Sequence, residues 1–357
     1  MNGPCAVTGA NGFVGSSVVR ELLRRGYEVI ALVGSDQDVH SLDGLPVKIR
    51  DFELHDRDSV RRGLDGAETV IHTAATYAFW AADSRDFYRV NVEGTRYVLD
   101  AAREIGVRKL VHTSSTATLS PSFENAEDRE RLGTEDGAFD LRRFRGHYKM
   151  SKAMAEELVL REAARGFPAV IVHPTTVIGP GDRRPTPSGL MIQQYVSGHM
   201  VVYLAMQQNV VDVRDVATGQ VLALEHARPG ERYILGGDNL PMREMLALLA
   251  ELTGIPAPKI PLPLPVLQLA GVVNELLADY VTHRPPLACR EQAMHVRDSR
   301  YVSIEKARRE LGYAPRPARA VLAAAVHWFA SEGFCKREIA ERILRRPELE
   351  EALRASS

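Results

Sequence analysis

A tyrosine and a lysine stand four residues apart in GHYKMSKAMAEE, residues 146–157. On a helix, Tyr148 and Lys152 lie one turn apart on the same face, with Cβ atoms about 5–6 Å apart. A free tyrosine has a pKa of about 10, and bringing it near neutrality takes roughly 4 kcal/mol of preference for the phenolate. A neighbouring ammonium favours the phenolate, so the pair could serve as a general acid and base. A solvated helix could also carry such a pair without a function.

Hydroxyl side chains end the apolar stretch KLVHTSSTAT, residues 109–118. Side chains alternate along a strand, so Thr113 and Ser115 share one face while Ser114 points to the other. Ligands bind at the carboxyl ends of the strands in a doubly wound sheet. We therefore predict that Ser115 lies at the end of its strand, beside the helix that carries Tyr148 and Lys152. Thr116 is its rival, because an offset of one residue would bring that hydroxyl to the substrate instead.

A glycine-rich loop lies near the start of the chain. VTGANGFVGS places Gly9, Gly12 and Gly15 between a strand-like and a helix-like segment. One glycine permits the tight turn, one lets the backbone approach a pyrophosphate, and one lets the helix pack closely on the strand. The N–H groups at the helix N-terminus favour phosphate. The loop predicts a dinucleotide site that also includes Asn11, Phe13 and Val14; a glycine-rich turn without a ligand is the alternative.

Strand-like and helix-like segments alternate through the first half of the chain. β-branched apolar runs such as CAVTG, EVIALV, ETVIHTA, KLVHTSS and PAVIVHP are separated by segments with helical spacing, including 86–105 and 147–165. This alternation predicts an α/β fold, a doubly wound parallel sheet (Rossmann) covered by helices on both faces.

The pattern changes after about Pro174, where GPGDRRPTPSG reads as an irregular loop. We predict a dinucleotide-binding domain over 1–174, with 209–235 returning to it. A smaller, interleaved substrate lobe is expected from 175–208 and 236–315. A C-terminal helical segment then covers 316–357.

Composition excludes several classes of protein. The formal net charge is −1, with 45% apolar and 25% charged residues, so no global field favours nucleic acid. Three widely spaced cysteines argue against a disulfide framework, and neither cysteine nor histidine spacing predicts a metal site. The apolar segment 260–281 contains early prolines and two acids, so we predict a turn and an amphipathic helix rather than a membrane span. A cytoplasmic location is expected.

The chemical residues and their order resemble those of the extended short-chain dehydrogenases/reductases. The pattern is Gly9-x-x-Gly12-x-x-Gly15, then Ser115, then Tyr148-x-x-x-Lys152. More narrowly, the chain resembles the hopanoid-associated sugar epimerases and the dihydroflavonol-4-reductase-like reductases, in segments that include FYRVNVEGTRYVLDAA and GERYILGGDNL. The resemblance implies that Tyr148 is the general acid/base, that Lys152 lowers its pKa and holds the nicotinamide ribose, and that Ser115 binds the reacting oxygen.

The resemblance also implies further site residues and a homodimer formed through the tyrosine-bearing helix. The acid and apolar pair beside the adenine would be Asp51 and Phe52. Small residues under the cofactor, a supporting helix asparagine and a loop near the nicotinamide would be supplied by Ala74, Ala75, Asn91, Pro174, Thr175 and Val177.

The residues after the second strand usually report the choice of cofactor. An acid there binds the ribose of NAD, whereas an arginine receives the 2′-phosphate of NADP. Here Val33 and Gly34 stand in that place, Ser35 could hydrogen-bond a phosphate, and Asp36 lies slightly too far on. We therefore expect NADP, weakly preferred, with NAD possible. Asp36 and Arg50 are the alternatives if the preference is different.

The reaction is expected to be hydride transfer to or from a carbonyl or secondary alcohol of a bulky small molecule. Tyr77, Phe79 and Trp80 favour a partly apolar substrate, although core packing would explain them equally well. An epimerase or dehydratase acting on a nucleotide-linked sugar is the alternative. A diphosphate needs paired cations, and residues 207–209 (Gln, Gln, Asn) have no basic residue, although Arg183 and Arg184 in the nearby loop could supply the charge. A non-catalytic NAD(P)-binding sensor is the alternative from another class, and the intact catalytic set argues against it.

Overall fold

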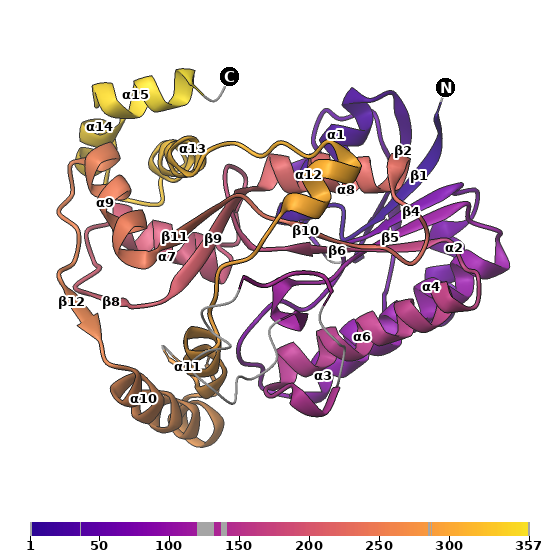
Figure 1. The fold of residues 1–357 in the computed structure, drawn as a ribbon, viewed down its shortest axis with the longest axis horizontal. Coiled ribbons are helices and arrows are strands. Elements are labelled where there is room, and N and C mark those ends of the chain that lie inside the picture. The colour runs from indigo at the N-terminus through magenta and orange to yellow at the C-terminus, as the bar shows by residue number, and fades with distance from the viewer. Residues whose placement is uncertain are drawn as a thin grey trace.

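The fold is built around a sheet of parallel strands. The computed structural model describes residues 2–35, 37–119, 132–136, 141–284, 286 and 288–355. In this part of the chain, seven parallel strands form the main sheet in the order β10-β6-β5-β4-β1-β2-β3. They are β1 (Asn2–Thr8), β2 (Tyr27–Val33), β3 (Lys48–Asp51), β4 (Thr69–His72), β5 (Lys109–Thr113), β6 (Ala169–Pro174) and β10 (Arg232–Leu235). The predicted doubly wound sheet is confirmed (Figure 1).

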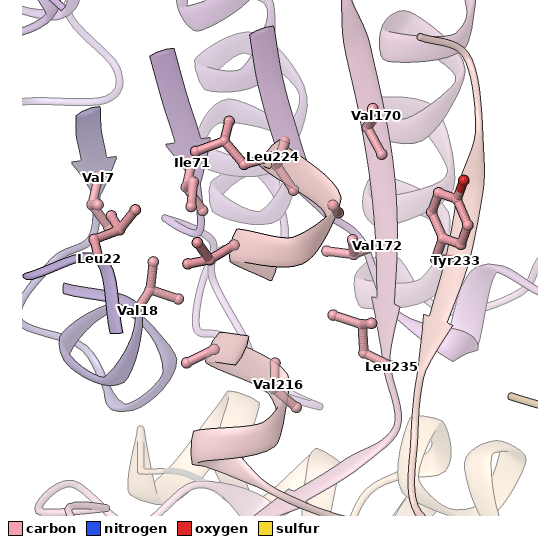
Figure 2. Packing of buried hydrophobic residues seen from close by; sticks show 14 of the residues in the cluster. Val7, Val18, Leu22, Ile71, Val170, Val172, Val216, Leu224, Tyr233 and Leu235 are labelled. Atoms are coloured by element: carbon pink, nitrogen blue, oxygen red, sulfur yellow. The ribbon is translucent and has the colours of Figure 1, made fainter. Parts of the chain in front are cut away.

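Helices cover both faces of the main sheet. One face carries α1 (Phe13–Arg24), α8 (Val213–His226) and α12 (Glu305–Leu311), and the other carries α2 (Arg57–Leu64), α4 (Gly94–Glu104) and α6 (His147–Ala164). Side-chain alternation explains the two layers, because Val7 packs toward α1 and α8 while Ala6 packs toward the other face. Figure 2 shows Val18 and Leu22 of α1 packed against Val7.

Short elements at the carboxyl edge of the sheet complete the main domain. α3 (Arg85–Tyr88) and the π-helical turn η2 (Arg89–Glu93) run directly into α4, which agrees with the helix expected over 86–105. The remaining short turns are η1 (His40–Leu42), η3 (Thr116–Thr118) and η4 (Leu141–Arg143). η1 lies in the connection from β2 to β3, and η3 and η4 lie in the connection from β5 to α6.

A smaller lobe contains two further sheets and its own core. β7 (Thr176–Ile178) is parallel to β9 (Gln207–Asp212), which pairs antiparallel with β11 (Asp238–Pro241), and β8 (Val202–Leu204) is parallel to β12 (Ile260–Leu262). The lobe core is formed with helices α7 (Pro187–Val196), α9 (Met242–Thr253), α13 (Ala318–Ser331), α14 (Arg337–Leu344) and α15 (Pro347–Arg354). The C-terminal helices therefore pack into this lobe.

Two boundaries differ from the predicted ones. The return to the main domain was expected at residue 209, but β9 pairs within the smaller lobe, and the return begins with α8. Residues up to 315 were expected in the substrate lobe, but Val302, Ala307 and Leu311 are buried in the core of the main domain. Strand pairing and packing partners decide these boundaries, and a local sequence pattern does not contain that information.

A third group of helices lies beside both domains. It consists of α10 (Leu264–Leu277), the π-helical turn η5 (Ala278–Thr282) and α11 (Arg290–Arg297). In Figure 1, α10 and α11 lie together at the lower left, away from the main sheet. The continuous segment Leu264–Thr282 is, by length and composition, apolar enough to cross a membrane.

Leu22 offers a test of the main core. Its side chain is fully buried between α1 and the sheet, so Leu22→Ala should lower the free energy of unfolding by about 2–5 kcal/mol. Leu269 on α10 is 67% exposed, and Leu269→Ala, the matched control, should change it by less than about 0.5 kcal/mol. Urea unfolding followed by circular dichroism measures both. Equal effects of the two substitutions would contradict the described packing.

Candidate active site

The glycine loop forms a tight cradle between β1 and α1. Gly9 has φ +64°, and the Gly12 N–H donates to the Gly9 carbonyl at 3.0 Å. A Cβ on Gly15 would lie 2.1 Å from the Gly9 carbonyl oxygen, so this position requires glycine. No side chain caps the N-terminus of α1, and no acid stands in its first turn. The N-terminal N–H groups and the positive end of the helix dipole thus face the position that a pyrophosphate would take.

One cavity of about 500 Å³ joins this loop to the predicted catalytic residues. It is lined by Ser115, Tyr148, Lys152 and Tyr77, and by the predicted cofactor residues Gly9, Asn11, Gly12, Phe13, Val14, Gly15, Phe52, Ala74, Ala75, Pro174, Thr175 and Val177. The structure therefore brings together the loops that follow β1, β4 and β5 with residues of α6 and the end of β6. A cavity that runs from the glycine loop to Tyr148 and Lys152 fits a dinucleotide.

Lys152 is buried and held at the end of β5. Its Nζ donates to the Thr113 carbonyl oxygen at 2.7 Å, and only 4% of the residue is exposed. Burial lowers the pKa of Lys152 to about 8, although the Glu156 carboxylate acts in the opposite direction. The ammonium and the neutral amine are therefore both accessible near neutral pH.

Tyr148 lies one turn before Lys152 and is also buried, with 7% of its surface exposed. We expected Lys152 to lower its pKa, but the pKa of Tyr148 is raised. Burial is the main cause and Tyr77 adds to it, and a hydrogen bond with the Ser115 side chain offsets only part of the increase. The two tyrosine rings are 5.3 Å apart between centroids. Tyr148 is thus a neutral phenol at physiological pH.

The geometry distinguishes Ser115 from its rival. Ser115 begins η3, where its Oγ accepts from the Ala117 N–H at 3.2 Å, and it lines the same cavity as Tyr148. Thr116 instead lines a separate, smaller cavity of about 60 Å³, and its hydroxyl donates to the Pro174 carbonyl oxygen at 3.4 Å. Ser115 is therefore the hydroxyl beside Tyr148.

Asn91 does not line the cofactor cavity, although it was predicted among the cofactor residues. It is buried, and its Oδ1 accepts from the Thr76 N–H at 2.8 Å while its Nδ2 donates to the Ser151 hydroxyl at 3.0 Å. It thus fixes the loop before Tyr77 against α6. Asn91 therefore stabilises the position of the loop and of α6, both of which contribute residues to the cavity.

The adenosine end differs from the predicted set. Ser35 and Asp51 do not line the cavity, and Asp36 lies outside the described residues. Gln37, Glu53 and His55 line it instead, and one Glu53 carboxylate oxygen accepts from the Ser35 N–H at 3.1 Å. Arg50, the other alternative, donates to the carbonyl oxygens of Gly63 and Asp65. Sequence reasoning missed Glu53 because it follows the third strand, whereas the usual acid follows the second.

The aromatic residues predicted for the substrate occupy two places. Tyr77 and Phe79 pack around Tyr148, with ring centroids 5.3 and 6.3 Å from it. Trp80 lines a neighbouring cavity of about 710 Å³ and donates from Nε1 to Asp279 at 3.1 Å. Phe79 lines the second cavity and its ring packs on that of Tyr148, so it lies between the two cavities. Among the described residues, no three metal-ligating side chains come together.

Comparisons with known proteins agree with this geometry. The model of the protein family described as "NAD dependent epimerase/dehydratase family" matches residues 5–236 of the chain. The chain belongs to this family. It is 37% identical over 338 residues to a putative dihydroflavonol 4-reductase of Synechocystis sp., covering 93% of this chain and 96% of the relative. It is 34% identical over 330 residues to sterol demethylase protein B of Methylococcus capsulatus, covering 92% and 98%.

A solved structure has the same fold. The crystal structure of gox2253 matches with a TM-score of 0.82 and 37% identity, covering 94% of this chain and all of the other. Family membership implies that NAD(P) is the cofactor and that the substrate is a small molecule. The predicted family resemblance is confirmed.

Glu53 gives a test of cofactor choice. A carboxylate at the adenosine end of the cavity repels a 2′-phosphate, so Glu53→Gln should raise the affinity for NADPH by about tenfold or less, with a smaller change for NADH. The control is Glu28→Gln, which removes an exposed carboxylate that pairs with Lys48 elsewhere on the sheet. Fluorescence titration measures both affinities. Equal responses of NADPH and NADH to Glu53→Gln would contradict this role.

Proposed function

We propose that this protein is an NAD(P)-dependent reductase or dehydrogenase that acts on a carbonyl or secondary alcohol of a bulky, partly apolar small molecule. The observation that carries the proposal is the convergence of Ser115, Tyr148 and Lys152 on the cavity that begins at the glycine loop. The relative named as a putative dihydroflavonol 4-reductase supports the same reaction class. When bound, the cofactor supplies or accepts the hydride.

Tyr148 is the proposed proton donor in the direction of reduction. Its raised pKa keeps the phenol protonated, so the hydroxyl can give its proton to the substrate oxygen as that oxygen gains negative charge. The Ser115 hydroxyl, beside it, hydrogen-bonds the same oxygen. The Lys152 ammonium stabilises the phenolate that the donation leaves.

For the choice of cofactor, we propose at most a weak preference for NADP. An acid after the second strand is missing, but Glu53 lies at the adenosine end of the cavity, and no arginine is among the described residues that line it. The attractive and repulsive contributions to 2′-phosphate binding are thus both small.

A nucleotide-sugar epimerase is the weaker proposal. A diphosphate needs available cations, and the cationic groups near the small cavity behind Thr116 are engaged within the protein. Lys149 pairs with Asp298 at 3.1 Å, and Arg300 donates to the Leu119 carbonyl oxygen. Glutamines 207 and 208 provide polar but neutral groups there. The aromatic residues around Tyr148 fit an apolar substrate better.

Replacing the phenol tests the proposed reaction. Tyr148→Phe should lower kcat by at least about 100-fold, because the proton donor is lost, while the cofactor affinity changes little. The control is Tyr97→Phe on α4, outside the cavity, which should keep full turnover. Oxidation of NAD(P)H with a panel of carbonyl compounds measures turnover. A Tyr148→Phe protein with normal turnover would contradict the proposal.

The pH profile tests the role of Lys152. Its lowered pKa of about 8 predicts that kcat/KM falls above about pH 8, as the ammonium loses its proton. Glu156 raises this pKa, so Glu156→Gln should move the descending limb to lower pH by on the order of one unit. Glu157→Gln, which removes the partly exposed partner of Arg161, is the control and should leave the limb in place. A limb that stays or moves upward in Glu156→Gln would contradict this assignment.

A further inference from the structure

The segment Leu264–Thr282 presents an apolar surface to solvent. Only 22% of its most apolar 18 residues are buried, although their mean hydropathy is 1.2. The most exposed side chains are Tyr280, 79% exposed, and Val281 and Leu269, 68% and 67% exposed. Together with Val273, Leu276 and Leu277 they form what we call the outer face. Soluble monomers rarely expose a contiguous apolar surface of this kind without a binding function.

The two carboxylates of the same segment are bound by other residues of the protein. Glu275 is buried and pairs with Arg290, whose backbone N–H also donates to it at 2.7 Å. Asp279 accepts from the Trp80 indole at 3.1 Å. Buried positions recur at Leu267, Gly271, Glu275 and Ala278, with helical spacing. Glu275 therefore lies on the side of the helix that packs against the protein, and the apolar outer face lies on the opposite side.

This packing excludes a transmembrane position for the segment in the folded protein. A span would expose all sides of the helix to lipid, and both carboxylates would lose their partners in a medium where an unpaired charge is costly. A helix that lies along the surface of a bilayer buries only its outer face and keeps these contacts.

Charge at the two ends of the segment favours a lipid surface over an apolar protein partner. Lys259 precedes it and Arg284 follows it, and both residues are exposed. Basic residues that flank an apolar helix reach the anionic headgroups of a bilayer, and a tyrosine near the end suits the interfacial region. Exposed Ile260 on β12, directly before α10, continues the apolar surface.

A cavity lies on the inner side of the same helix. The space of about 710 Å³ is lined by Val272, Glu275 and Asp279 from the segment and by Phe79, Trp80 and Phe87 from the main domain. Phe79 is the residue whose ring packs on Tyr148, at 6.3 Å between centroids. The cavity therefore lies between the apolar helix and the candidate active site.

We propose that the outer face of Leu264–Thr282 docks on a lipid bilayer with anionic headgroups, and that the adjoining cavity admits a membrane-dissolved substrate. The second part rests on the proposed function. The first part stands on the exposed face, its flanking charges and the inward carboxylates alone.

Flotation with vesicles tests the docking. The full chain should float with vesicles of phosphatidylcholine and phosphatidylglycerol, and less with phosphatidylcholine alone. The variant Leu269→Asp/Leu276→Asp should lower the partition by about tenfold or more, since charge replaces apolar contact. Ile49→Asp is the matched control, because Ile49 is 48% exposed on β3, and it should float like the native chain. A milder pair, Leu269→Ser/Leu276→Ser, should show a smaller loss in the same direction.

NADPH binding, light scattering and flotation of the Tyr148→Phe variant are the additional measurements. Unchanged NADPH binding shows that the variants are folded. A native chain that fails to float, or aspartate variants that float as well as it does, would overturn the docking. Light scattering that shows a dimer broken by Leu269→Asp/Leu276→Asp, without flotation of the native chain, would assign the face to a second copy and also overturn it. Tyr148→Phe should float normally, so docking and catalysis can fail independently.

Discussion

The site depends on one buried hydrogen bond, from the Lys152 ammonium to the Thr113 carbonyl oxygen at 2.7 Å. A buried ammonium without a partner is costly, so this contact fixes α6 against the carboxyl end of β5. Ser115 follows Thr113 by two residues, and Tyr148 precedes Lys152 by one helical turn. The bond therefore sets the position of all three proposed catalytic side chains at once.

A buried carboxylate, that of Glu156, extends the same constraint along α6. Glu156, one turn after Lys152, accepts from the hydroxyls of Ser114 and Thr118 at 2.6 Å and lies 3.0 Å from the His173 ring nitrogen. Burial alone would raise the pKa of Glu156, but His173 and the two hydroxyls outweigh it and lower the pKa to about 2. Because this pKa is lowered, its contribution to stability is present at neutral pH and is lost only as the pH falls toward 2. The helix is thus tied to β5, η3 and β6.

Much of this arrangement could be predicted from the sequence, because the decisive signals are local. The glycine spacing marks a turn that only glycine permits, and the Tyr148–Lys152 spacing follows from helix geometry. Position in space was harder to predict. Glu53 comes to the adenosine end because β3 lies beside β2, and β9 leaves the main sheet because it pairs with β7 and β11. The helical period of 264–282 predicts an amphipathic helix, but it cannot tell which face meets solvent. That depends on Arg290 and Trp80, which are distant from the acids in sequence.

An isotope label shows whether the protein transfers a hydride from the cofactor to a carbonyl carbon. A carbonyl compound that supports oxidation of NADPH would be incubated with NADPH deuterated at C4 of the nicotinamide, and the product analysed by mass spectrometry. One deuterium is expected on the new carbinol carbon for each cofactor oxidised, when the label is on the face of the ring from which the hydride is transferred. Two results together would contradict net hydride transfer. The protein would invert a nucleotide-linked sugar without net consumption of cofactor, and no carbonyl compound would yield a labelled alcohol with the label on either face of the nicotinamide.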